Sequence, residues 1–184
     1  DDSGWATPSL CAGFTVREVL AHLTATGSLG AIRWFAGVLR CRFDFDRQVS
    51  MRLAEQLGSS GPQTLARFRS TVASTTCPPL PRLALLGEVI VHAQDIRHPL
   101  AVERAYPIDT LTAVARYYRG ADQVVLAKGR VADLRLVATD GPFAAGDGPL
   151  VSGPTVALVM AMTGRGAYCQ DLTGDGVPVL RERC

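Results

Sequence analysis

The sequence lacks the features that mark membrane and nucleic-acid-binding proteins. Its apolar runs, of which Val156 to Met162 is one of the longest, are too short to cross a bilayer. The first ten residues, DDSGWATPSL, do not have the pattern of a signal peptide. Basic residues form no cluster and the net charge is only +2, which argues against phosphate binding along a nucleic acid. We therefore expect neither a membrane nor a nucleic acid as partner.

Cysteine is scarce and follows no disulfide or zinc pattern. The count is odd, the spacings are wide and no CxxC pair occurs among Cys11, Cys41, Cys77, Cys169 and Cys184. This arrangement is not that of a disulfide framework or a zinc–thiolate site. Reduced thiols indicate a cytoplasmic protein. Asparagine is absent and lysine occurs once, a bias that a GC-rich genome would produce.

What is present is an ordinary globular composition. The 184 residues are 47% hydrophobic and 20% charged, enough for one good-sized domain or two small ones. Helical patterns fill the chain to about residue 128, and mixed helix and strand patterns follow. The sequence thus predicts an α+β protein with a helical domain over residues 1–128 and a small α/β domain over residues 129–184.

The clearest helix start is FTVREVLAHL, where Thr15 and Glu18 form a capping-box pattern. Apolar residues follow at helical spacing, and the helix is expected to run toward Arg40 with Gly27 and Gly30 as weak points. Other helices are expected over residues 46–57, 62–74, 82–97 and 109–127 and in GPTVALVMAMTG, and strands over residues 134–140 and in the last segment, GDGVPVL.

One apolar helix carries an unusual set of polar residues. In GEVIVHAQDIRHPL, Glu88, His92 and Asp95 stand at i, i+4 and i+7, so they share one helix face. The helix is apolar around most of its circumference, which predicts that it is buried. A buried carboxylate needs a cation, a hydrogen-bond network or a metal. A glutamate and a histidine one turn apart can hold a divalent metal, or they can simply stabilise the helix as a pair.

The small number of histidines limits the choice of a third ligand. Of the three, His98 precedes Pro99 at the helix end and is interpreted as a cap or solvent residue. His22 lies beside the apolar stripe of the capped helix, so helix packing would complete a set of His22, Glu88 and His92. Such a set leaves a coordination position open, as catalytic zinc sites do. Asp95 is then a candidate to hold the second nitrogen of a ligating imidazole. The pairing of Glu88 and His92 without metal stays open as the alternative.

Three segments resemble the mycothiol-dependent maleylpyruvate isomerase family of actinobacteria. They are PSLCAGFTVREVLAHL with the preceding Trp5, GEVIVHAQDIRHPL, and TGRGAYCQDLTGDGVPVL, and they occur in the family's order over almost the whole chain. The resemblance implies a DinB-like up-and-down four-helix bundle followed by a small α/β domain. The family's helix before the tryptophan segment has no counterpart in this chain, and His98 and Ala101 stand where the family tends toward Arg and Gly.

The resemblance also implies site residues. The metal ligands of the family fall on His22, Glu88 and His92, and its domain-interface arginine falls on Arg165, which could pair with a substrate carboxylate. Arg165 is therefore the candidate catalytic residue, and a surface cation at a helix end is the alternative interpretation. Asp95 becomes a supporting residue of the metal site.

The function implied is that of a zinc and mycothiol enzyme. Zinc, or another divalent metal, would bind the thiol of mycothiol and lower its pKa, and the thiolate would act in cis–trans isomerisation or in S-transfer. The substrate would be a small electrophile that carries a carboxylate. A metal-binding or ligand-binding module without turnover is the alternative, and zinc without affinity for mycothiol would favour it.

Overall fold

The computed structural model describes residues 2–122 and 125–184. They form helices and one small three-stranded sheet, which confirms the predicted α+β class. The chain divides into two compact units, one of Asp1–Pro81 with His92–Glu103 and one of Arg82–Val91 with Arg104–Cys184. The helix α6 (Arg82–Arg97) contributes residues to both units. Within the described residues, no helix is long and apolar enough to span a membrane.

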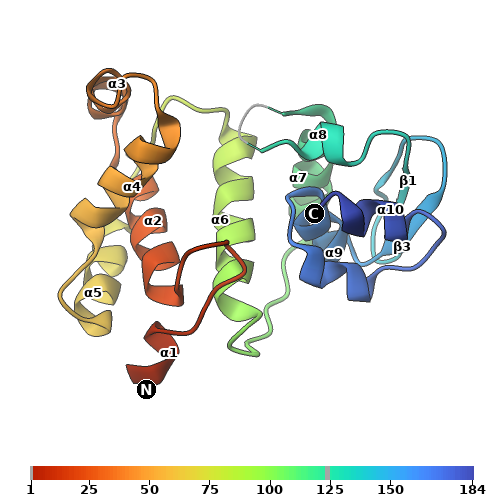
Figure 1. Ribbon diagram of the computed structural model, residues 1–184, viewed down its shortest axis with the longest axis horizontal. Coiled ribbons are helices and arrows are strands. Elements are labelled where there is room, and N and C mark those ends of the chain that lie inside the picture. Colours follow the sequence, from red (N-terminus) through yellow and green to blue (C-terminus); the bar gives the residue numbers. More distant parts are fainter. Residues whose placement is uncertain (1, 123–124) are drawn as a thin grey trace. The chain divides into compact units, whose positions relative to one another are not determined.

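Unit 1 is helical and is organised around α2 (Val16–Ser28). The other helices are α1 (Asp2–Trp5), α3 (Ala31–Arg40), α4 (Phe45–Gln56), α5 (Gly61–Thr71) and the end of α6 (Figure 1). Helix α2 packs against both α4 and α5 and buries its apolar stripe there. Val16, Val19 and Leu20 are almost completely shielded from solvent, so this stripe forms the centre of the unit's core.

The capping box predicted at the start of α2 is confirmed. The Glu18 amide donates to the Thr15 hydroxyl oxygen, and the Thr15 amide donates to the Glu18 carboxylate at 2.8 Å. The single helix expected to reach Arg40 is instead two helices, because Leu29 adopts an extended conformation and Gly30 serves as the N-cap of α3. Gly30 was one of the two predicted weak points.

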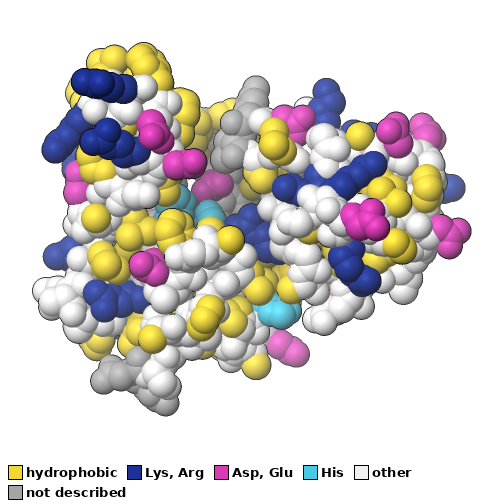
Figure 2. Space-filling model, in the orientation of Figure 1, with side chains coloured by type: hydrophobic (Ala, Val, Ile, Leu, Met, Phe, Trp, Pro, Cys, Tyr) yellow, Lys and Arg dark blue, Asp and Glu magenta, His cyan; other side chains and the backbone are white. Residues whose placement is uncertain are grey.

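Helix α3 is held to α4 through its backbone and buries only part of its surface. Gln48 and Arg52 of α4 donate to the carbonyls of Trp34 and Arg33, at 3.2 and 2.6 Å. The opposite face of α3 is apolar and exposed, and Figure 2 shows hydrophobic side chains gathered with arginines at this position. The exposed apolar residues of this segment are Ile32, Phe35, Leu39 and Phe43.

Unit 2 places helix α9 (Thr155–Met162) against a small mixed sheet. Its strands are β1 (Arg135–Ala138), β2 (Ala144–Ala145) and β3 (Leu150–Gly153), in the order β2-β1-β3. Strand β1 pairs antiparallel with β2 and parallel with β3. Helix α9 (Thr155–Met162) is buried along nearly its whole length, and it packs on α7 (Ile108–Gly120) and on the 3-10 helix η1 (Gly166–Asp171). The short helices α8 (Ala127–Arg130) and α10 (Val177–Glu182) complete the unit.

Two expectations for this part of the chain are wrong. The last segment, GDGVPVL, is helix α10 rather than a strand: Pro178 falls in the first turn, where proline is tolerated, and Val177 and Leu180 are buried at helical spacing. The helix expected over residues 109–127 ends at Gly120, and residues 123–124 of that prediction lie outside the described residues. The domain boundary near residue 128 stays a prediction.

Helix α6 has the predicted bounds, but it is not buried all round. Leu83, Leu86 and Val89 are 37% to 51% exposed, whereas Ile90, Val91, His92 and Asp95 are buried. An apolar composition therefore did not reveal which side of this helix faces the core.

Candidate metal centre

Helix α6 sets the relative positions of Glu88 and His92. The two residues are four apart on one regular helix, so their side chains leave the same face one turn from each other. Glu88 is half-buried and His92 is only 8% exposed. A carboxylate and an imidazole are thus presented together in surroundings with limited access to water.

Asp95 fixes the orientation of the His92 ring. Its carboxylate is completely buried, and its Oδ2 lies 2.8 Å from Nδ1 of His92. A carboxylate can only accept here, so Nδ1 carries a hydrogen and Nε2 is the ring nitrogen left for another partner. Histidines that bind metals are usually held in this way by a carboxylate or carbonyl. The geometry leaves Nε2 as the ligand atom of His92.

Helix α2 supplies the second imidazole. The rings of His22 and His92 meet edge to face, with their centroids 4.7 Å apart and their planes at 74°. His22 lies one turn after Glu18 of the capping box, so the fixed start of α2 also fixes the height of His22 along the helix.

The ligand atoms of His22, Glu88 and His92 lie within 4.8 Å of one another. Zinc bonds nitrogen and oxygen at about 2.0–2.2 Å, so two ligand atoms at a tetrahedral angle lie about 3.4 Å apart, and the side chains would have to close by up to roughly 1.4 Å. Two imidazoles and one carboxylate are also a chemically suitable donor set for a divalent metal. The residues therefore fit a metal, and their role as ligands stays a prediction.

A second cluster in unit 1 was not predicted from the sequence. Cys11 brings its thiol to within 4.8 Å of ligand atoms of His92 and Asp95. The backbone amide of Leu10 donates to the carbonyl of Asp95 at 3.2 Å, which holds the Cys11 loop against α6. No sequence pattern links Cys11 to His92, which lies 81 positions further along the chain. Since Nδ1 of His92 is hydrogen-bonded to Asp95, we assign this cluster to the support of His92.

Unit 2 places three polar residues near the start of α6. Tyr118 is buried, and its hydroxyl lies over Gly87, where an added Cβ would be 2.4 Å away. Burial raises the pKa of Tyr118 far above its usual range, the Glu88 carboxylate raises it further, and the Arg165 guanidinium opposes both. Glu88 and Arg165 are thus both close enough to influence one phenol electrostatically. Arg165 also donates to the Thr163 carbonyl at 2.8 Å, so its side chain folds back over the end of α9.

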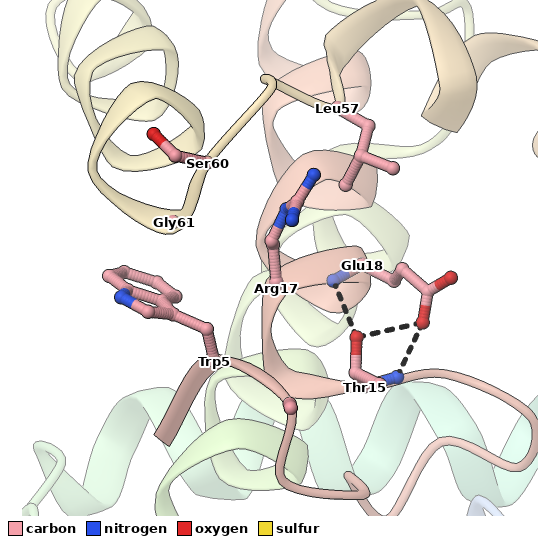
Figure 3. Close-up of a pocket in the computed structure, with 8 residues that line it drawn as sticks. Trp5, Thr15, Arg17, Glu18, Leu57, Ser60 and Gly61 are labelled. Atoms are coloured by element: carbon pink, nitrogen blue, oxygen red, sulfur yellow. Dashed lines mark hydrogen bonds between the residues drawn. The ribbon is translucent and has the colours of Figure 1, made fainter. Parts of the chain in front are cut away.

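A separate cavity of about 460 Å³ lies in unit 1 at the start of α2. Figure 3 shows Trp5 and Arg17 on either side of it, with the start of α5 nearby. The Trp5 ring packs on Gly61, where an added Cβ would be 2.3 Å from it, and Arg17 donates to the Gly58 carbonyl. Glu18 also lines the cavity and precedes His22 by one turn, about 6 Å along the axis. No sequence pattern indicates this cavity, because Trp5 is far from residues 57–61 in the chain.

Comparison with known proteins identifies the N-terminal part of the chain. No curated protein and no solved structure gave a match. Residues 1–78 match the model of the mycothiol maleylpyruvate isomerase N-terminal domain, a segment that includes His22 and ends before Glu88, His92 and Arg165. This match confirms the family resemblance found in the sequence over residues 1–78, which are similar to the mycothiol maleylpyruvate isomerase N-terminal domain.

Proposed function

We propose that the protein is a mycothiol-dependent metalloenzyme that catalyses cis–trans isomerisation of, or S-transfer to, a small electrophilic substrate. The observation that carries the proposal is the convergence of His22, Glu88 and His92, with His92 oriented by a buried Asp95. The family of residues 1–78 supports a thiol cosubstrate. A free thiol needs reducing surroundings, so we propose a cytoplasmic location.

In this proposal His22, Glu88 and His92 hold zinc or another divalent metal and leave at least one coordination position open. The bound metal would supply the charge that lowers the pKa of a coordinated thiol. Asp95 accepts a hydrogen bond from Nδ1 of His92, so Nε2 is the ring nitrogen that can bind the metal. Tyr118, whose raised pKa keeps its hydroxyl protonated, remains a hydrogen-bond donor throughout the neutral range.

The thiol chemistry accounts for isomerisation without net consumption of the thiol. Addition of a thiolate to the cis carbon–carbon double bond of an unsaturated oxo acid leaves a single bond that can rotate. Loss of the same thiolate restores the double bond in the trans form, whereas retention of the thiol gives S-transfer. Arg165 is the proposed anion-binding residue, because a guanidinium can hold a carboxylate with two hydrogen bonds.

The cavity beside α2 is the proposed site for the part of the cosubstrate that does not react. Trp5 offers an aromatic surface, and Arg17 and Ser60 offer polar groups around a space large enough for a small molecule. We expect Trp5→Ala to raise the KM for the thiol and to leave metal affinity unchanged. We also propose that the helices of the N-terminal part form the DinB-like four-helix bundle that the family implies.

The experiment is a joint measurement of bound metal and thiol-dependent turnover. The wild-type protein, His92→Ala and Glu88→Gln are purified without chelator, their metal content is determined by elemental analysis, and isomerisation of maleylpyruvate is followed with and without mycothiol. We expect close to one metal ion per chain in the wild type and loss of both metal and turnover in the variants, because each variant removes one ligand atom.

The matched control is His98→Ala, which removes the histidine at the C-cap of the same helix. It should keep both metal and turnover. Full thiol-dependent turnover with bound zinc in His92→Ala would refute the assignment of the site. Bound metal with no measurable affinity for mycothiol in the wild type would instead favour a metal-binding module without turnover.

A further inference from the structure

Two thiols of unit 2 are neighbours in the fold although they are 15 positions apart in the sequence. Cys169 is buried in η1, and Cys184 follows α10. Each thiol is close enough to the other to influence its pKa. Residue Cys184 is exposed, but its thiol turns inward and donates to the carbonyl of Ala161 at 3.4 Å. Cys184 is therefore accessible to small reagents, whereas Cys169 is shielded from solvent.

The geometry of η1 explains how Cys184 reaches Cys169. A 3-10 helix has three residues per turn, so Gly166 and Cys169 lie on one side of it. A Cβ added at Gly166 would be 3.2 Å from the Cβ of Cys184, which places Cys184 directly against that side. Glycine at position 166 leaves the room that the Cys184 side chain occupies.

The segment that carries Cys184 is fixed on both sides. Arg130 donates from Nε to the carbonyl of Arg183 at 2.9 Å, and Arg183 donates back to the carbonyls of Arg130 and Ala132 at 3.0 and 2.7 Å. Arg181 donates to the carbonyl of Cys169 at 3.4 Å. These contacts hold the segment of Cys184 beside η1, so a reaction between the two thiols is effectively intramolecular.

We propose that Cys169 and Cys184 form a redox-active dithiol that a low-molecular-weight disulfide closes to an intramolecular disulfide. The Cys184 thiolate attacks one sulfur of the small disulfide, whose S–S bond breaks and releases one thiolate. The Cys169 sulfur then attacks the Cys184 sulfur of the mixed disulfide and releases the second small thiolate. The two protons lost by the cysteines go to the two released thiolates. The small disulfide is reduced by two electrons and the cysteine pair is oxidised by two.

The environment of the pair sets the pH at which it reacts. Burial and the neighbouring Cys169 raise the pKa of Cys184 to about 11, and burial also raises the pKa of Cys169. The charged groups that face the pair, Arg130 of α8 and Arg181 of α10, act in the opposite direction. Because thiolate is the reactive form, closure should be slow near pH 7 and should accelerate about tenfold per pH unit up to pH 10.

The test uses the full chain with Cys77→Ser, which removes the other exposed cysteine. Native protein is incubated with hydroxyethyl disulfide between pH 7 and 10, trapped with acid and analysed by mass spectrometry. We expect a product that is lighter by two hydrogen atoms, in which the peptide containing Cys169 is linked to Cys184. The disulfide should also raise Tm by about 5 °C or more, because it closes a loop of roughly 15 residues.

Two variants separate the steps. Cys169→Ala should stop at the mixed disulfide on Cys184, and Cys184→Ser should give no adduct at Cys169, because that thiol is 1% exposed. Accumulation of a mixed disulfide without closure in the native Cys77→Ser protein would overturn the proposal, and so would absence of reaction at pH 10. Circular dichroism under the same conditions establishes that the protein is folded, so neither result depends on the stability of a variant.

Discussion

The contact between Asp95 and His92 gives the sharpest test of the proposed metal centre. Asp95→Asn keeps the shape of a side chain that is completely buried and removes its charge. The amide oxygen can still accept from Nδ1 of His92, over the 2.8 Å that now separates the ring from the carboxylate. This hydrogen bond is weaker because its acceptor is neutral, and His92 becomes a less basic ligand.

The expected loss is a factor of about 10 to 100 in metal affinity, which corresponds to roughly 1.4–2.7 kcal/mol. It is measured by competition for zinc with a chelator of known affinity, at one fixed pH. Asp46→Asn is the matched control, because Asp46 carries the same group in the exposed first turn of α4. Unchanged zinc affinity in Asp95→Asn, together with loss of zinc in His92→Ala, would refute the proposed role of Asp95.

Three further predictions concern the surroundings of this site. Gly87→Ala should lower the free energy of unfolding by about 1–3 kcal/mol, measured with denaturant, because its Cβ would lie 2.4 Å from the Tyr118 hydroxyl; Gly120→Ala, with no atom within 4 Å of the added Cβ, should not. The raised pKa of Tyr118 means that the folded state holds the phenol proton more tightly than the unfolded state does. The free energy of unfolding of the wild type should therefore decrease above pH 10, and it should decrease less in Tyr118→Phe. Thermal unfolding at several pH values measures both. Thr15→Ala should cost about 1 kcal/mol in denaturant unfolding, because it removes the N-cap acceptor of the Glu18 amide.

Local signals in the sequence predicted most helices correctly. The capping box of Thr15 and Glu18 involves residues three apart, and the bounds of α6 follow from Pro81 and Pro99. Such features involve only residues that are close in the sequence, so the sequence alone is enough to predict where these helices begin and end. The strand prediction for the last segment is wrong because Val-Pro-Val-Leu resembles a strand when only near neighbours are considered. That Val177 and Leu180 are the buried residues depends on tertiary packing, which the sequence pattern does not contain.

The candidate metal centre was predictable in part. Glu88, His92 and Asp95 share a face of one helix, and that spacing needs no tertiary information. His22 was added because histidines are few and because of the family resemblance, and the structure brings its ring to 4.7 Å from that of His92. The position of Cys11 near His92 depends on a backbone hydrogen bond between residues 10 and 95. Hydrophobic periodicity cannot predict such a long-range contact.

The same limit explains why the two cysteines at the end of the chain were interpreted only as reduced thiols. Sequence motifs for paired cysteines have the two residues two or three positions apart, and Cys169 and Cys184 do not match them. The fold makes them neighbours through the 3-10 helix η1, the missing side chain of Gly166 and the contacts between Arg130 and Arg183. If the dithiol closes, it ties η1, whose N-cap is Arg165, to the end of α10. The oxidation state of Cys169 and Cys184 would then act on the segment next to the proposed anion-binding residue. A change in KM for the carboxylate substrate on oxidation, absent in Cys184→Ser, would demonstrate that link.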